Sequence, residues 1–246
     1  MNVLFPPRAL CCFLLMSFSV SAAAAQTAAV AVRVLILDES DAAYVIKDNG
    51  EYRSVSSYPY AISPPFDVEP DRPCDVYKEI HFLDDSGQAH TRYEAIAQVK
   101  VSDTVESVLV VVAATASGEY ILTYYPDGEE DFPAGTVRVI NLGHLPIAAS
   151  VGSGIFSITP KAVQFMQPKL DHKRRFFTRV AEKESEQWNI LYDDVSVLRP
   201  NERMTGIVVY SPSGMRHTYT ESEIIEYGPP PPGHYWLSYT DTSLQD

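Results

Sequence analysis

The chain has 246 residues, of which 46% are hydrophobic, and its 32 acidic side chains against 19 lysines and arginines give a formal net charge of −13. This length is sufficient for a hydrophobic core in one large domain or two small ones. The charge argues against nucleic acid as a partner, because phosphate binding needs a basic surface.

The first 25 residues have the pattern of a secretory signal peptide. Arg8 precedes an apolar run over residues 9–20, and small residues ending at Ala25 follow it. The run is about a dozen residues long, whereas a bilayer span needs about 20. We therefore expect residues 1–25 to be cleaved, with a retained anchor as the alternative. The mature chain is then exported, to the periplasm, the outer surface or the medium, and has no transmembrane segment.

Cleavage leaves 221 residues with Cys74 as the only cysteine. A single cysteine cannot form an internal disulfide, so the hydrophobic core alone must hold the exported chain together. We expect Cys74 to be a small buried or edge residue. A reactive thiol is the alternative, although no basic partner is visible in the sequence.

Short strand patterns separated by turns fill the mature chain. Residues 93–101 alternate between apolar and polar side chains, whereas residues 108–113 are apolar on both faces, as in a central strand. No segment shows a capped helix of period 3.6. This pattern predicts an all-β fold built from antiparallel, immunoglobulin-like β-sandwiches. Further strands are expected at residues 30–37, 44–47, 75–82, 120–125, 136–142, 176–180, 188–192 and 207–210.

A weak internal repeat indicates two such sandwiches in tandem. Residues 32–37 resemble residues 137–142, 105 positions later, and residues 110–112 resemble residues 207–209, about 96 positions later. Coincidence between similar strands is the alternative. With a repeat of about 100 residues, the usual domain size, we expect the first domain at residues 26–131 and the second at residues 132–227.

The last segment, residues 228–246, contains four consecutive prolines, which cannot pair in a central strand. We expect it to be a linker and a C-terminal tail. Charge also differs along the chain. Residues 26–131 hold 20 acidic and 7 basic side chains, whereas residues 132–246 hold 12 and 11. Such asymmetry is compatible with two domains of different surface character.

The expected join between the domains carries a recognisable motif. Phe132, Pro133 and Gly135 are followed by Arg138, and then by Asn141 and Pro146. This spacing resembles the FPxG…RxxN…P signature of a family of uncharacterised exported bacterial proteins. The resemblance implies a signal peptide, β-sandwich-like repeats and a bacterial envelope or secreted setting. It implies no activity, because that family has no known catalytic residues.

Catalytic and metal motifs are not apparent. The six histidines do not show metal-ligand spacing, so we expect surface or hydrogen-bonded roles for them. The acidic run at residues 127–131 is expected to be a solvated linker, with a calcium loop as the alternative. Residues 152–154, Gly-Ser-Gly, indicate a hairpin turn rather than a serine nucleophile. We predict no catalytic residue, no cofactor and no metal ligand. Two carboxylates on separate strands leave no linear signature, however, so a hydrolase stays an alternative.

Two features suggest binding. Residues 161–183 are rich in lysine and arginine, and Lys173, Arg174 and Arg175 are candidates for contacting an acidic partner, with a solvated hairpin as the alternative. In the tail, Tyr235 and Trp236 are candidates for recruiting a partner. Aromatic side chains also fill β-sandwich cores or stack on sugars. The aromatic residues considered for surface platforms are Tyr58, Tyr60, Tyr124, Tyr125, Trp188, Tyr235 and Trp236.

These observations predict an exported, non-enzymatic binding or structural protein of the bacterial cell envelope, whose partner is an envelope protein or a polysaccharide. A carbohydrate-binding module is the first alternative, which needs exposed aromatic residues in a row. The second is a hydrolase, which needs two carboxylates converging in a cleft.

Overall fold

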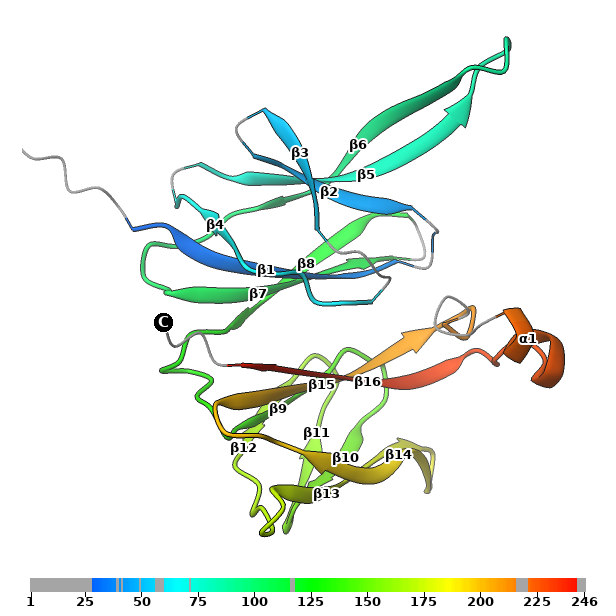
Figure 1. Cartoon of the computed structure of the whole chain (residues 1–246). Coiled ribbons are helices and arrows are strands. Elements are labelled where there is room, and N and C mark those ends of the chain that lie inside the picture. The colour runs from blue at the N-terminus through cyan, green and yellow to red at the C-terminus, as the bar shows by residue number, and fades with distance from the viewer. Residues whose placement is uncertain are drawn as a thin grey trace, which may run out of the picture.

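The structure is a computed structural model that describes residues 28–38, 40, 42–48, 50–55, 60–70, 72–115, 118–215 and 221–242. The expected signal peptide, residues 1–25, lies outside them. The described chain is almost entirely β, so the predicted all-β class is confirmed (Figure 1). No helix within these ranges has the length and apolar character needed to cross a membrane.

Strands β1 to β8 form the N-terminal half, in two sheets of four strands. Sheet A has the order β4-β1-β7-β8, and sheet B has the order β3-β2-β5-β6. The strands span β1 Val30–Leu37, β2 Ala43–Asp48, β3 Glu51–Ser54, β4 Phe66–Val68, β5 Cys74–Leu83, β6 Ala89–Val99, β7 Ser107–Ala114 and β8 Tyr120–Pro126.

Strands β9 to β16 form the C-terminal half in the same way. Sheet C has the order β12-β9-β15-β16, and sheet D has the order β11-β10-β13-β14. A short helix, α1, precedes the last strand. The bounds are β9 Val137–Asn141, β10 Ile147–Val151, β11 Gly154–Ile158, β12 Val163–Met166, β13 Arg175–Glu184, β14 Gln187–Val197, β15 Glu202–Ser211, α1 Glu221–Tyr227 and β16 Gly233–Thr242.

The two halves repeat one topology. Val32 on β1 pairs with Val108 on β7, and Val137 on β9 pairs with Met204 on β15. Val137 follows Val32 by 105 positions, and Met204 follows Val108 by 96 positions. One pair of strands in each half therefore reproduces both offsets of the sequence repeat. Both pairs are parallel, so the expectation of purely antiparallel sheets is wrong for sheets A and C. A long crossover through the opposite sheet allows this pairing, which a hairpin does not.

Each half has its own core, and a third apolar cluster joins the halves. Valines and isoleucines of sheets A and B fill the first core, and those of sheets C and D fill the second. Alternate residues of β1, such as Leu35, face away from the first core and pack against sheet C. The sheets therefore stack in the order B, A, C, D, with B and D at opposite ends (Figure 1).

Two details at the C-terminus differ from the expectation. Gly233–Thr242 is not part of a tail, because it forms β16, which pairs with β15 over its whole length. The prolines only connect α1 to this strand. Helix α1 itself was not expected, since its 7 residues are too few for a visible helical period.

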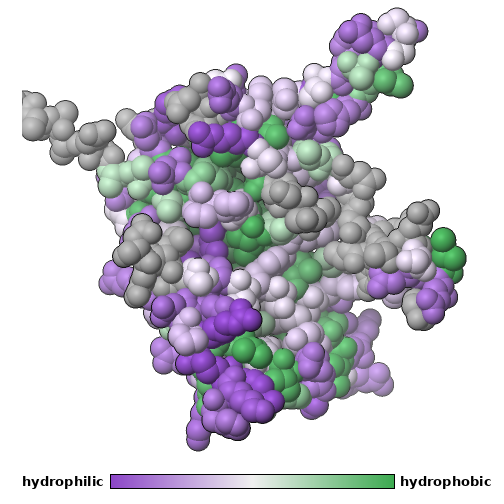
Figure 2. Space-filling view, viewed as in Figure 1, coloured by the Kyte–Doolittle hydropathy of each residue, from purple (hydrophilic) through white to green (hydrophobic). Residues whose placement is uncertain are grey.

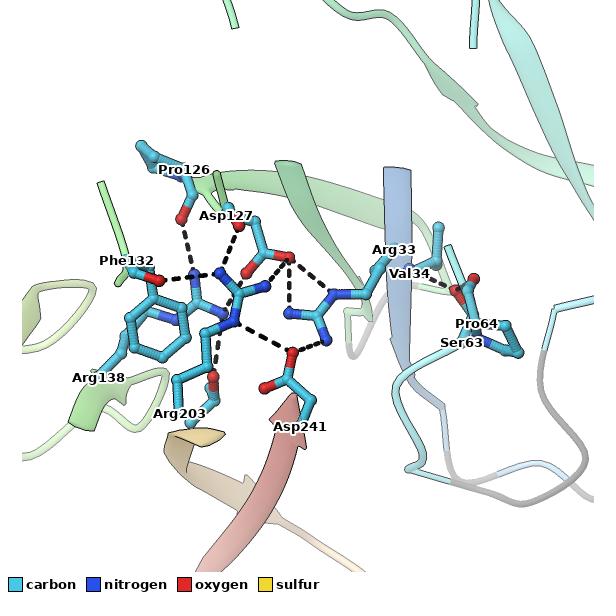
Figure 3. A network of polar contacts seen from close by, with 11 residues as sticks. Arg33, Val34, Ser63, Pro64, Pro126, Asp127, Phe132, Arg138, Arg203 and Asp241 are labelled. Atoms are coloured by element: carbon cyan, nitrogen blue, oxygen red, sulfur yellow. Dashed lines mark hydrogen bonds and ion pairs between the residues drawn. The ribbon is translucent and has the colours of Figure 1, made fainter. Parts of the chain in front are cut away.

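A buried ionic cluster lies between sheets A and C (Figure 3). Its centre is Asp127, directly after β8, whose side chain is fully buried. Arg33 Nε donates to Asp127 Oδ2 over 2.7 Å, and Arg138 Nη2 donates to Oδ1 over 3.0 Å. Arg203 Nη2 lies 3.4 Å from Oδ2. One carboxylate from the N-terminal half therefore binds two arginines of the C-terminal half and one arginine of its own half.

The cluster follows the internal repeat. Arg33 and Arg138 occupy equivalent positions on β1 and β9, and Asp127 and Asp241 occupy equivalent positions after Pro126 and Thr240. Asp241 accepts from Arg33, and Arg203 Nε lies 3.2 Å from its Oδ2. The contact between the halves thus has approximate twofold character.

Aromatic and carbonyl groups complete the solvation of the arginines. The ring of Phe132 lies 4.3 Å from the Arg138 guanidinium and 4.8 Å from that of Arg203. Arg203 Nη1 also donates to the carbonyls of Asp127 and Phe132, over 2.7 and 2.9 Å. Burial lowers the pKa of Arg138 to about 10, although Asp127 opposes this shift. Arg138 therefore still carries its charge at neutral pH.

We predict that Asp127→Asn lowers the free energy of unfolding by about 3–5 kcal/mol, because it leaves three guanidiniums without their shared buried counter-ion. Urea unfolding monitored by tryptophan fluorescence measures this. Asp131→Asn is the matched control, because Asp131 is exposed in the same loop, and it should change stability by less than about 0.5 kcal/mol. Equal effects of the two variants would contradict a central role for Asp127.

Candidate functional site

The outer face of sheet D presents the most extensive group of exposed apolar side chains near the predicted basic residues. On β13, Arg175, Phe177 and Arg179 point away from the core, because the residues between them are buried. Their cross-strand partners on β14 are Val197, Val195 and Asp193. Since opposite residues of an antiparallel pair share a face, these side chains form one surface.

A β-bulge keeps this surface continuous along β14. The register shifts opposite Val180 and Ala181, so that Leu191 is the extra residue. Beyond the bulge, Ile190 and Trp188 join the outer face opposite Ala181 and Lys183. Ile155 of β11 reaches the same face beside Ser150.

We call this surface the sheet D platform. Its apolar members are between 41% and 77% exposed. Figure 2 shows hydrophobic residues at the surface at the lower end of the molecule, where Figure 1 places sheet D. Exposed apolar groups gathered on one face commonly mark an interaction site. The platform consists of Ile155, Phe177, Trp188, Ile190, Val195 and Val197, together with Arg175, Arg179 and Lys183.

The basic residues of the platform are partly neutralised. Arg175 binds Asp171 through two hydrogen bonds of 2.9 and 2.8 Å, and Arg179 binds Asp193 in the same manner. The Arg179 guanidinium also lies 5.3 Å from the ring of Phe177. Solvent screens such exposed pairs, so both arginines remain available to a partner that brings its own carboxylates.

The three predicted basic residues have different surroundings. Lys173 is exposed in the turn before β13, where its backbone N–H donates to Asp171. Arg174, in a left-handed conformation, donates to the carbonyls of Leu198 and Arg199, so it links β13 to the loop after β14. Of the three, Arg175 lies on the platform itself.

Tyr235 and Trp236 face opposite sides of β16. Tyr235 packs into the cluster between the halves, and its hydroxyl donates to Pro231. Trp236 packs on the second core, where it stacks on Tyr192 and covers Gly206. A Cβ at position 206 would overlap the indole ring, which explains the glycine in the middle of β15. Both rings therefore contribute to packing.

The other aromatic candidates divide into exposed and buried side chains. Trp188 and Tyr124 are exposed, whereas Tyr60 and Tyr125 are buried. Tyr58 lies outside the described residues. On β5, Cys74 packs at the margin of the first core, as expected for a small edge residue.

The acidic run at residues 127–131 is only partly the solvated linker that the sequence predicts, because Glu130 and Asp131 are exposed but Asp127 is not. Asp127 is buried among arginines, which occupy its carboxylate oxygens. At the end of β1, Asp38 accepts hydrogen bonds from Tyr44 and Tyr120. Although burial raises it, these hydrogen bonds hold the pKa of Asp38 well below its ordinary value. Among the described residues no group of three or more histidine, cysteine or acidic side chains is placed to hold a metal ion.

A pocket of about 520 Å³ lies beside the ionic cluster, lined by residues 61–65 and 239–242 with Arg33. Asp241 is at its wall, and Asp127 lies behind Arg33. These two carboxylates converge, which is the feature that a hydrolase requires. Both are bound to Arg33, however, and Asp127 does not itself line the pocket.

One arrangement of side chains has no linear signature in the sequence. The rings of His144 and His234 are 90 positions apart, yet their centroids are 4.5 Å apart. His234 Nδ1 contacts Glu182, and its Nε2 accepts weakly from the backbone N–H of His144. Gly143 allows this, because a Cβ there would lie 2.6 Å from the His234 ring. Burial, together with His144, lowers the pKa of His234, although Glu182 opposes the shift.

Comparison with known proteins gives no assignment. No protein-family model matches the chain, and no curated protein is significantly similar to it.

We predict that the chain loses stability when the pH falls below about 6.5, because unfolded His234 binds a proton more readily than the buried ring does. Between pH 7 and pH 5 the free energy of unfolding should therefore fall because of this group. His234→Gln should remove that part of the pH dependence, measured by urea unfolding at each pH. His90→Gln, at an exposed histidine, is the control. A His234→Gln profile identical to that of the wild type would contradict the prediction.

Proposed function

We propose that this chain is an exported, non-enzymatic binding protein of the bacterial cell envelope and that it binds its partner through the sheet D platform. The observation that carries this proposal is the continuous exposed face of Phe177, Val195 and Ile190 beside Arg175 and Arg179. An interface core of aromatic and aliphatic groups with arginines around it is typical of protein–protein recognition.

Export and the envelope setting rest on the sequence. The pattern of residues 1–25 and the resemblance of the Phe132–Asn141 region to exported bacterial proteins support them. An immunoglobulin-like relationship of the two halves is likewise part of the proposal, supported by paired sheets that enclose one core in each half.

A polysaccharide partner is the second candidate. Trp188, half exposed on the platform, is the observation that favours it, because sugar rings stack on exposed indole faces. Phe177 lies on the same face, although the Arg179 guanidinium lies close to its ring. Val195 lies opposite Phe177, and Ile190 is the next outer residue of β14 after Trp188; these aliphatic side chains suit a protein better than a sugar.

The proposal predicts salt-sensitive capture of a partner by the processed chain. Immobilised protein is incubated with solubilised envelope from the producing bacterium, and bound proteins are quantified by mass spectrometry. The double variant Phe177→Ser/Ile190→Ser should lose at least 90% of the specific capture. Lys100→Gln in the N-terminal half is the control and should retain it. Salt should weaken the capture, because exposed charge pairs are screened within about 8–10 Å.

Two results would overturn the proposal. Equal capture by the double variant and the wild type would exclude the platform. Salt-insensitive binding to purified polysaccharide, lost in Trp188→Ala, would instead favour the carbohydrate-binding alternative. Hydrolysis of glycan, peptide or ester substrates by the processed chain would exclude a non-enzymatic role.

A further inference from the structure

The outer face of sheet B is the counterpart of the sheet D platform in the repeat. Tyr52 of β3 and Tyr93 of β6 stack with ring centroids 3.7 Å apart, and Tyr77 of β5 meets Tyr52 edge-on at 5.4 Å. Lys47 lies over Tyr52 at 5.4 Å. Two acids, Asp75 and Glu79, flank the rings on the same side of β5. We call these three tyrosines with Asp75 and Glu79 the sheet B face.

The two outer faces carry opposite net charges, and the tyrosine rings of one face suit the guanidinium groups of the other. The sheet B face carries two acids against Lys47, whereas the sheet D platform carries three bases against Asp171 and Asp193. The surrounding halves differ in the same direction, with a net charge of −13 for residues 26–131 and −1 for residues 132–246. Tyrosine rings also attract guanidinium groups, and the platform carries Arg175 and Arg179.

The chain already contains one contact in which two sheets pack through their outer faces. Sheets A and C pack through faces that point away from their own cores, with leucine, isoleucine and tyrosine side chains in contact. Arginines and aspartates lie at the margin of that contact. In the described part of the chain, the stack B, A, C, D places sheets B and D at opposite ends. A second copy that places its sheet B on sheet D would continue the same stacking.

From this complementarity we propose that the partner of the sheet D platform is the sheet B face of a second copy, so that the protein associates head to tail. This inference rests on the proposed function of the platform. A symmetric contact between two sheet D platforms is disfavoured, because it would bring Arg175, Arg179 and Lys183 of both copies together. Head-to-tail contacts use two different surfaces and extend into chains unless the rotation closes a ring.

The test is sedimentation velocity of the processed chain at increasing concentration. The wild type should form species larger than a dimer at 50 mM NaCl, and the apparent dissociation constant should rise at least tenfold at 500 mM NaCl. One variant, Lys183→Glu/Val195→Glu, changes only the platform. A second, Glu79→Lys, changes only the sheet B face. Lys100→Glu and Glu119→Lys are charge-matched controls at exposed positions outside both faces, and they should associate as the wild type does.

Each face variant should be monomeric alone, yet their mixture should form a one-to-one heterodimer, because each retains the face that the other lacks. Continued dimerisation of Glu79→Lys would indicate a symmetric contact and overturn the proposal. A wild type that stays monomeric at all concentrations would also overturn it. In that case, loss of envelope capture by Phe177→Ser/Ile190→Ser would still support the proposed function with a different partner.

Discussion

The burial of Asp127 among arginines is the constraint on which the arrangement of the two halves depends. A carboxylate with no solvent exposure is tolerated only when charged donors replace its water. Here Arg33 comes from one half, and Arg138 and Arg203 come from the other. The acid is therefore satisfied only when both halves are folded and in contact. The apolar cluster between sheets A and C supplies buried apolar area, whereas these ion pairs define the position of one half relative to the other.

This constraint explains why the motif at the join is structural. Phe132 lies against two guanidiniums, and Arg138 binds Asp127. Gly135 has a φ of 81°, which favours glycine at this turn. Asn141 is buried, donates to the carbonyls of Leu145 and Ile158 and accepts from Gly143. Each of these residues has a role in joining or shaping the halves, so the motif requires no catalytic function.

The sequence predicted the positions of the strands better than it predicted which charged side chains are buried. Alternation and apolar runs located β1, β5, β6 and β7, because each buries one or two faces over many residues. Short edge strands such as β4 and β12 lack that length. The acidic loop at 127–131 was expected to be solvated. Its residues Glu130 and Asp131 are exposed, as that expectation requires. Nothing local distinguishes Asp127, whose partners lie 94, 11 and 76 positions away.

The same limit applies to the candidate site. Arg175 was found from a basic run, but Phe177, Ile190 and Val195 have the composition of core residues, and only the register of β13 with β14 shows that they face outward. In a sandwich each sheet has two faces, and a strand that is apolar on both has an unsatisfied side unless another layer covers it. Sheets A and C cover one another through the cluster around Leu35 and Ile207. Sheet D repeats the pattern of an apolar outer face with arginines, but among the residues that the structure describes no fifth layer covers it. A structure that buries one such face internally thus leaves its equivalent available to another molecule.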